Sequence, residues 1–338
     1  MWILLVALAM PASACGRAAS DETTATPSVP SSEGTAAPAP TATPTPTPGP
    51  LTLVAVGDMM LARSVGQRVL SDGPEVVFGE AVAAILREAD LAIGNLECAV
   101  SERGEPQPKG YTFRAPPAAV EALELAGFDM VSLANNHALD YGPDALHDTV
   151  MHLEDRGIRA VGAGPDLPAA SAATILERGG LRIAFVGLVD VPPEGPGFSR
   201  DTWEAGPDSW GVAWADEETV RAAVAAAAES ADIVVALLHF GFEYHTTPSA
   251  AQRTLAHTAI DAGASLVIGT HPHVLQEVEE YGGGLIAYSL GNFVFDGFDG
   301  TANDSAILRV TLEADAVLAW ELVPVELVDN GLPRLQQR

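Results

Sequence analysis

The chain has 338 residues, and its 45 Asp and Glu residues against 17 Lys and Arg residues give a formal net charge of −28. Nucleic-acid binding needs a basic surface that displaces counterions from phosphates, so this charge balance argues against a nucleic-acid partner. A hydrophobic content of 48% excludes a wholly disordered chain. Two cysteines, Cys15 and Cys98, are too few for a disulfide framework or a thiolate zinc site.

Residues 1–14 form an apolar run that ends in small residues. The run is too short to span a bilayer, which takes about 20 apolar residues, and it fits a secretory signal peptide. Ala12–Cys15 resembles a bacterial lipobox, in which the cysteine is lipidated and becomes the first mature residue. We therefore expect an extracytoplasmic lipoprotein, attached to the bacterial cell membrane through Cys15. The alternative is an ordinary signal peptide with an incidental cysteine, which gives a secreted protein.

Residues 15–50 are predicted to be a disordered tether. Eight prolines and eight threonines lie between positions 21 and 50, and no apolar periodicity is present. Such a segment cannot bury enough surface to fold and behaves as an extended linker. If Cys15 carries a lipid, Cys98 has no disulfide partner and is expected to be a buried, unreactive thiol.

From residue 51 onward, strand and helix patterns alternate. The predicted helices cover 82–88, 117–126, 144–156, 217–229 and 249–261, with Asp216 as an N-cap residue. The predicted strands in the alternating part cover 51–56, 91–94, 129–134, 159–161, 182–188, 233–239 and 265–268. Only strands are predicted in the last part of the chain, over 274–279, 285–289, 306–313 and 317–325.

This order predicts a largely parallel α/β core with an added antiparallel portion. We interpret residues 51–328 as one domain, followed by a tail over 329–338. The segment 197–215 is rich in Gly, Pro and Trp and is predicted to be a long surface loop.

Polar side chains follow five of the predicted strands. Since the carboxyl ends of parallel strands share one edge of a sheet, these residues are expected to converge there. They are hard oxygen and nitrogen ligands, which suit Mn, Fe or Zn. The set comprises Asp58, Glu97, the run Asn135–Asn136–His137, His239, and the pair His271 and His273.

Each of these residues alone has a structural interpretation. A strand-end Asp is commonly a cap, and a lone strand-end His is commonly a hydrogen-bonded structural residue. The pair His271 and His273 is more specific, because alternate residues of an extended segment share a face. The co-occurrence at five strand ends favours a metal centre. Four histidines lack this placement and are interpreted as structural or solvated: His147, His152, His245 and His257.

The motifs GDMML, GNLE, SLANNHALDYG, LLHFGFEY, GTHPHVLQ and AYSLGNFVFD occur in this order between residues 51 and 296. This series resembles the CapA/PgsA family of capsule and poly-γ-glutamate synthesis proteins. That family is similar to the calcineurin-like metallophosphoesterases. The resemblance implies a four-layer α/β/β/α sandwich of the metallophosphoesterase type, with a site for one or two divalent transition-metal ions.

The resemblance also implies roles for individual residues. Asp58 and His273 would bind the first metal, and Glu97 takes the place of a bridging aspartate. The second metal would be completed by Asn136, His239 and His271. His137 would be the catalytic acid or a substrate contact. In phosphoesterases a histidine follows the first aspartate by two residues, and here that position is Met60, whose thioether is a poor ligand for a hard cation.

Four further residues are candidates for substrate binding. Lys109 and Arg114 are expected to meet an anionic group near the metals, and the alternative is two solvated loop residues. Asn135 lies in the Asn-Asn-His motif. Asn292 either reaches the site or belongs to a tight turn that needs Gly291.

Two functions remain open. The first is a surface-anchored protein of capsule or poly-γ-glutamate biosynthesis or export with a metal-dependent hydrolase site for a phosphoester, γ-glutamyl or peptide amide bond. The second is a non-catalytic binding or assembly subunit of a polymer-export complex, which Met60 favours. Expected partners are a cell-envelope polymer, or its terminal group, and membrane-bound ligase or export subunits. Residues 115–338 hold 33 acidic against 10 basic residues, which favours a small or terminal group over an extended polyanion.

Overall fold

The computed structural model describes residues 49–194, 198–313 and 316–336. The expected signal peptide, the lipid attachment at Cys15 and residues 15–48 of the expected tether lie outside the described residues. Gly49 and Pro50 are exposed and lead directly into the first strand.

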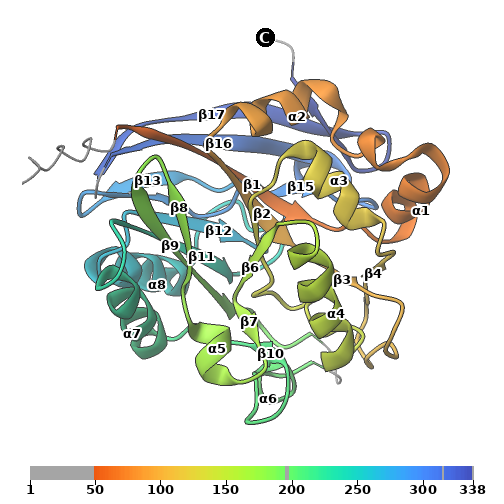
Figure 1. The fold of residues 1–338 in the computed structure, drawn as a ribbon, viewed down its shortest axis with the longest axis horizontal. Helices are drawn as coiled ribbons and strands as arrows, with labels where there is room; N and C mark the ends of the chain where they lie inside the picture. Colours follow the sequence, from red (N-terminus) through yellow and green to blue (C-terminus); the bar gives the residue numbers. More distant parts are fainter. Residues whose placement is uncertain (1–48, 195–197, 314–315, 337–338) are drawn as a thin grey trace, which may run out of the picture. The chain divides into compact units, whose positions relative to one another are not determined.

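The first sheet has eight strands in the order β18–β17–β16–β1–β2–β5–β6, and β15 also pairs with β1 (Figure 1). Pairing is parallel from β1 to β6 and antiparallel from β1 through β16 to β18. The C-terminal strands therefore build the antiparallel portion that the strand-only tail predicted. The strands are β1 (Leu51–Met59), β2 (Leu91–Leu96), β5 (Met130–Ser132), β6 (Arg159–Val161), β15 (Asn292–Val294), β16 (Asp304–Glu313), β17 (Ala316–Val328) and β18 (Leu332–Leu335).

The second sheet has six strands in the order β13–β14–β12–β11–β9–β8. Its four central strands are parallel, and β8 and β13 add to the two edges in antiparallel orientation. All eight residues of β11 are buried, as expected for a strand covered on both faces. The strands are β8 (Thr174–Arg178), β9 (Leu181–Asp190), β11 (Ile233–Phe240), β12 (Leu266–Thr270), β13 (Val278–Tyr281) and β14 (Gly284–Ala287).

Helices cover the outer face of each sheet, and the two inner faces share an apolar core. That core joins Leu53 and Ile93 of the first sheet to Phe185 and Val235 of the second. A separate cluster lies between the first sheet and α1 to α4, and another between the second sheet and α7 and α8. The layers thus follow the order helix, sheet, sheet, helix (Figure 1).

The helices are α1 (Arg63–Asp72), α2 (Gly79–Glu88), α3 (Ala119–Ala126), α4 (Pro143–Glu154), α5 (Leu167–Ser171), α6 (Arg200–Trp203), α7 (Glu217–Ala228) and α8 (Ala250–Asp261). Two short 3₁₀ turns lie at Pro74–Val76 and Gly300–Asn303. Four short strands form two small pairs: β3 (Ala99–Val100) pairs with β4 (Arg114–Ala115), and β7 (Ala163–Gly164) pairs with β10 (Gly211–Val212). The predicted N-cap of α7 is confirmed, since the Asp216 side chain accepts a hydrogen bond from the backbone N–H of Thr219 at 2.8 Å.

The prediction of a surface loop over 197–215 is wrong for its described part. Phe198 and Trp203 are 2% and 1% exposed, and β10 from this segment pairs with β7. Gly and Pro content indicated an irregular backbone correctly, but it says nothing about whether the aromatic side chains between those residues are buried. Cys98 is 1% exposed, and burial raises the pKa of its thiol to about 12, which confirms a buried thiol.

Three differences from the sequence expectation are informative. The strand expected over 274–279 begins only at Val278, because the preceding residues form the turn that carries His271 and His273. β18 pairs with β17, so the sheet continues into the tail expected over 329–338. Helix α1 was not predicted; its first turn is held by Asp296, whose carboxylate accepts from the backbone N–H of Ser64 at 3.0 Å, and sequence periodicity cannot reveal such a distant cap.

Burial of Trp203 can be tested by Trp203→Ala. Truncating a buried aromatic side chain leaves a cavity, so we expect the free energy of unfolding to fall by about 3 to 5 kcal/mol in equilibrium urea unfolding. Trp320→Ala is the matched control, because Trp320 is 38% exposed and its loss should cost less. Equal losses in the two variants would contradict the packing of this segment.

Candidate metal centre

The carboxyl ends of strands from both sheets meet at one edge. Asp58 is the penultimate residue of β1, and Glu97 directly follows β2. From the second sheet, His239 lies near the end of β11 and His271 directly follows β12. The two sheets are joined at this edge, since the backbone N–H of His271 donates to Asp58 Oδ2 at 3.1 Å. The convergence expected from the strand order is therefore present.

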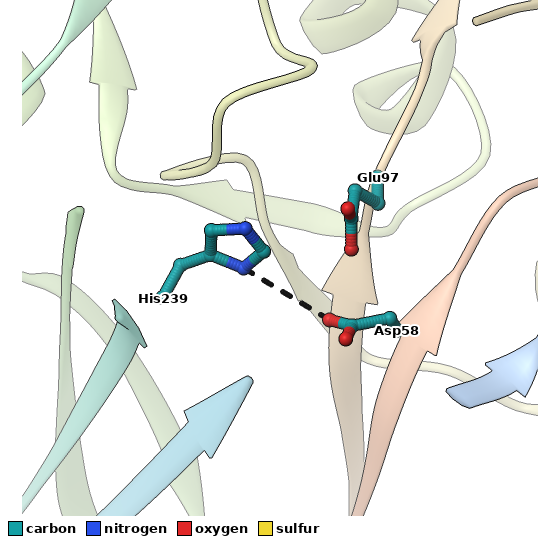
Figure 2. A group of neighbouring side chains, drawn as sticks. All are labelled: Asp58, Glu97 and His239. Carbon is teal, nitrogen blue, oxygen red and sulfur yellow. Dashed lines mark ion pairs between the residues drawn. The ribbon is translucent and has the colours of Figure 1, made fainter. Parts of the chain in front are cut away.

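Three side chains form the centre of the cluster. Asp58, Glu97 and His239 each present one ligand atom, and these atoms lie within 4.8 Å of one another. In Figure 2 the Glu97 carboxylate points toward Asp58, and the His239 ring faces Asp58 from the opposite sheet. His239 Nδ1 is 3.9 Å from Asp58 Oδ1. All three are almost completely buried, at 0%, 0% and 1% exposure.

Burying two carboxylates together has electrostatic consequences. Burial and the adjacent charge of Asp58 raise the pKa of Glu97 well above its usual value. Burial also opposes ionisation of Asp58, but a hydrogen bond and positive charge from His273 outweigh it and hold the pKa of Asp58 below its usual value. Among the described residues, Glu97 Oε1 has no hydrogen-bond partner. A cation placed between the carboxylates would remove the repulsion and satisfy this atom.

His271 and His273 come from a turn with unusual backbone geometry. Their φ angles are 95° and 56°, in the left-handed region that non-glycine residues seldom adopt. His273 Nδ1 is 3.3 Å from Asp58 Oδ2, and its Nε2 is 3.7 Å from Glu97 Oε1. Both ring nitrogens of His271 are buried, and neither has a hydrogen-bond partner in the part of the chain that the structure describes. Strained backbone that delivers an unpartnered imidazole to a carboxylate cluster is the arrangement expected of a metal ligand.

The protonation of His239 and His271 suits this role, whereas burial of His273 is outweighed by its hydrogen bond to Asp58, which raises its pKa, so a metal would have to displace its proton. Burial lowers the pKa of His239 to about 3 and lowers the pKa of His271 well below its usual value. Both imidazoles are therefore neutral at pH 7, which is the form that ligates metals. The residues present thus fit a divalent transition metal in both donor type and charge.

His137 stands beside the cluster and is oriented by a carboxylate. Its Nδ1 is 2.6 Å from Asp140 Oδ2, and its ring lies 4.3 Å from that of Phe113 between centroids. Its Nε2 is 3.9 Å from Glu97 Oε1. Burial lowers the pKa of His137 despite the opposing charge of Asp140. The neutral ring therefore donates through Nδ1 and leaves Nε2 available on the side of the cluster.

Asparagines connect these groups. Asn136 Oδ1 is 2.8 Å from His239 Nε2, so the amide oxygen lies beside the ring of one of the three central side chains. Asn135 Nδ2 donates to Asn95 Oδ1 at 3.0 Å and to the Leu96 carbonyl at 2.9 Å, so Asn135 braces the end of β2. Asn95 was not selected from the sequence, yet its Nδ2 donates to Asp58 Oδ1 at 2.8 Å and to Glu97 Oε2 at 3.2 Å. Its position in the GNLE motif, directly opposite Asp58 in the β1–β2 pairing, was the available signal.

Lys109 lies at the site, but its side chain is 0% exposed. Its Nζ contacts the Asn136 carbonyl at 2.7 Å, Asp140 Oδ1 at 3.1 Å and Glu194 Oε2 at 3.3 Å. Glu194 was also missed, because it follows β9 in a segment without a recognisable motif. The ammonium group of Lys109 is thus committed to protein acceptors, which corrects its expected role as a substrate contact.

Arg114 is not brought to the cluster. Its guanidinium donates to the carbonyls of Arg103 and Gly104 and lies 4.3 Å from the centre of the Tyr141 ring. Asn292, in contrast, is buried, and its Oδ1 is 2.8 Å from His273 Nδ1, so it orients a candidate ligand.

Met60 is 0% exposed and belongs to the apolar core between the first sheet and its helices. The four histidines interpreted as structural or solvated lie outside the cluster. His147 stacks on Trp210, His257 contacts Tyr281 and Glu279, His245 is exposed, and His152 is in the last turn of α4.

The ligand assignment can be tested on protein freed of metal by a chelator. His239→Ala removes a ligand nitrogen, and Asp58→Asn removes one carboxylate oxygen and the negative charge. We therefore expect Mn²⁺ affinity to fall by more than about 100-fold in isothermal titration calorimetry, beyond the loss seen for residues that only orient a ligand. Arg114→Gln is the control and should bind Mn²⁺ as the unaltered protein does. Unchanged affinity in His239→Ala would refute the assignment.

Comparison with known proteins gives the family. The model of the family described as "Bacterial capsule synthesis protein PGA_cap" matches residues 52–297. The PGA biosynthesis protein CapA of Bacillus subtilis (strain 168) is 34% identical over 275 residues, covering 80% of this chain and 70% of that protein. The capsule biosynthesis protein CapA of Bacillus anthracis is 32% identical over 292 residues, covering 84% of this chain and 69% of that protein.

Solved structures give likenesses at lower identity. A hypothetical protein from Thermus thermophilus has a TM-score of 0.50 and 20% identity, covering 82% of this chain and 99% of that chain. The NAD nucleotidase of Haemophilus influenzae has a TM-score of 0.45 and 11% identity, covering 86% and 54%. The first of these shares the fold. Since the family model extends from the start of β1 to the loop that follows β15, the chain belongs to the bacterial capsule synthesis (PGA_cap) family.

Proposed function

We propose that this protein acts in the synthesis or export of a capsule polymer, such as poly-γ-glutamate, through a metal-dependent hydrolase site. The family and the curated relatives named for capsule and PGA biosynthesis support the process. The buried group of Asp58, Glu97 and His239, with ligand atoms within 4.8 Å of one another, is the observation that carries the hydrolase site. Phosphoester and γ-glutamyl or peptide amide bonds are the proposed substrates.

Six residues would hold one or two Mn, Fe or Zn ions: Asp58, Glu97, Asn136, His239, His271 and His273. A bound ion would supply Lewis acidity and lower the pKa of a coordinated water. The chain itself excludes bulk solvent from this group, since every one of these side chains is buried. Asn292 and the backbone N–H of His271 fix the ligand geometry through their contacts with His273 and Asp58.

His137 is the proposed proton-transfer residue. Asp140 accepts from its Nδ1, which sets the ring so that Nε2 faces the cluster. During hydrolysis a water oxygen bonds to phosphorus or carbonyl carbon, and the bond to the leaving oxygen or nitrogen breaks. The attacking water gives up a proton and the leaving group needs one. His137 Nε2, which is unprotonated in the neutral ring, can accept the first proton and then donate it to the leaving group.

We also propose that the protein lies on the outer side of the cell membrane, attached through a lipidated Cys15, with membrane-bound ligase or export subunits as partners. Among the described residues, no helix is long and apolar enough to cross a membrane. Because the domain is strongly acidic, we propose that it meets the terminal group of a polymer rather than an extended polyanion.

The second candidate is a non-catalytic assembly subunit of an export complex. Met60 favours it, because the residue at a usual ligand position is packed in the apolar core and offers the cluster no ligand. Such a protein would use the same buried group to bind a polymer end without cleaving it.

The hydrolase can be tested with bis(p-nitrophenyl) phosphate and γ-glutamyl p-nitroanilide in the presence of Mn²⁺ or Zn²⁺. We expect the unaltered protein to bind metal and cleave one of these probes. His137→Ala should keep its metal and lose about 10²- to 10⁴-fold in kcat, the usual contribution of a proton-transfer group. The double variant His271→Ala with His273→Ala should lose both metal and turnover, and His245→Ala is the control from an exposed loop.

The outcomes separate the two candidates. Turnover that persists in the double variant, or full activity of the metal-free protein, would overturn the hydrolase. Bound metal without cleavage of either probe would favour the assembly subunit.

A further inference from the structure

Lys109 and Glu194 have no part in the proposed reaction, yet they belong to a polar network that adjoins the metal centre. Lys109 is its hub, with its ammonium group enclosed by Asp140, Glu194 and the Asn136 carbonyl. The Phe198 and Trp203 rings close the hub, with centroids 5.2 and 5.4 Å from Nζ. A lysine this enclosed cannot reach a substrate. Its ammonium group can act only on the protein groups that it contacts.

Glu194 connects Lys109 to the metal centre through hydrogen bonding with Asn136. Its Oε2 pairs with Lys109 Nζ at 3.3 Å, and its Oε1 accepts a hydrogen bond from Asn136 Nδ2. The opposite end of the same amide, Asn136 Oδ1, lies 2.8 Å from His239 Nε2. One asparagine side chain thus spans the carboxylate of Glu194 and the ligand cluster.

This contact determines which end of the amide faces the cluster. An asparagine amide has one end that accepts and one that donates, and an ionised carboxylate only accepts. Glu194 therefore selects the orientation in which Nδ2 points away from the cluster. Only the remaining end, Oδ1, has lone pairs that can bind a cation.

We infer that Glu194, held in place by Lys109, is a positioning residue that fixes the amide of Asn136 with its oxygen toward the metal. This inference rests on the metal centre of the proposed function. It gives Lys109 a structural task in the site and explains why a carboxylate from the segment after β9 is brought beside a group that already carries two carboxylates.

The test is Mn²⁺ binding by calorimetry to metal-freed protein with substitutions at two glutamates. Glu194→Ala removes the acceptor, so the amide is free to turn and we expect affinity to fall by about 10- to 100-fold. Glu194→Gln keeps an acceptor oxygen for Asn136 Nδ2 and should bind more tightly than Glu194→Ala. The Glu194 side chain is 24% exposed, and thermal unfolding checks that the variants remain folded.

Glu243 supplies the matched control for charge. It is exposed, and like Glu194 its negative charge acts on Glu97. Glu243→Ala and Glu243→Gln therefore remove the same charge from the surroundings of the cluster without touching Asn136. If Glu194 acts through its charge alone, Glu194→Ala and Glu194→Gln will have the same Mn²⁺ affinity as each other and as the two Glu243 variants. If Glu194 positions Asn136, only Glu194→Ala will have a Mn²⁺ affinity well below that of the other three variants.

A double-mutant cycle with Asn136→Asp makes the test independent of that comparison. An aspartate carboxylate has an oxygen at both ends, so its orientation needs no selection, and in this background Glu194→Ala should leave Mn²⁺ affinity unchanged or raise it. The same loss in both backgrounds would refute the positioning role. Failure of the unaltered protein to bind Mn²⁺, Zn²⁺ or Fe²⁺ would instead refute the metal centre itself.

Discussion

The burial of two carboxylates side by side is the constraint on which the rest of this site depends. Asp58 and Glu97 are both 0% exposed. If both were ionised, two unit charges about 4 Å apart would repel by roughly 4 kcal/mol at an effective dielectric constant of 20, and burial together with this repulsion raises the pKa of Glu97. Hydrogen bonds from Asn95 relieve part of this cost. Within residues 49–194, 198–313 and 316–336, Glu97 Oε1 and the His271 ring nitrogens have no hydrogen-bond partner, so the described donors leave the group incomplete.

The fold supplies this group by joining two sheets at their carboxyl ends. β1 and β2 deliver the carboxylates, and β11 and β12 deliver the imidazoles from the opposite sheet. The bond from the His271 N–H to Asp58 ties the sheets together where the ligands meet. The apolar core between the sheets is therefore what holds the carboxylates against their mutual repulsion. The hub at Lys109 adds a second layer of support from the segment 198–215.

Much of this arrangement could be predicted from the sequence. Buried parallel strands are continuous apolar runs in the sequence, and the polar residue after each run indicated Asp58, Glu97, His239 and His271. The order of the strands along the chain was enough to place these residues at one edge. The layer order came from the resemblance and agrees with the packing.

Other features could not be predicted, because they depend on contacts between distant residues. Glu194 lies in no motif, and only the folded chain brings it to Lys109 and Asn136. Lys109 and Arg114 looked equivalent in the sequence, yet one is enclosed by acceptors and the other turns toward Tyr141. Trp203 is buried in a segment whose composition is typical of a surface loop. In each case the residue type determines what the side chain can bind, but tertiary packing determines where that side chain lies, and the sequence does not show this.

The central claim is that this buried group holds a cation, and crystals grown with Mn²⁺ test it most directly through anomalous scattering. The account predicts an anomalous peak within about 2.0 to 2.3 Å of oxygens from Asp58 and Glu97 and of a ring nitrogen of His239. The contrary result would be a crystal in which these three side chains are well ordered and Mn²⁺ binds fully at other positions, but no anomalous peak lies between the three side chains. That result would contradict the account.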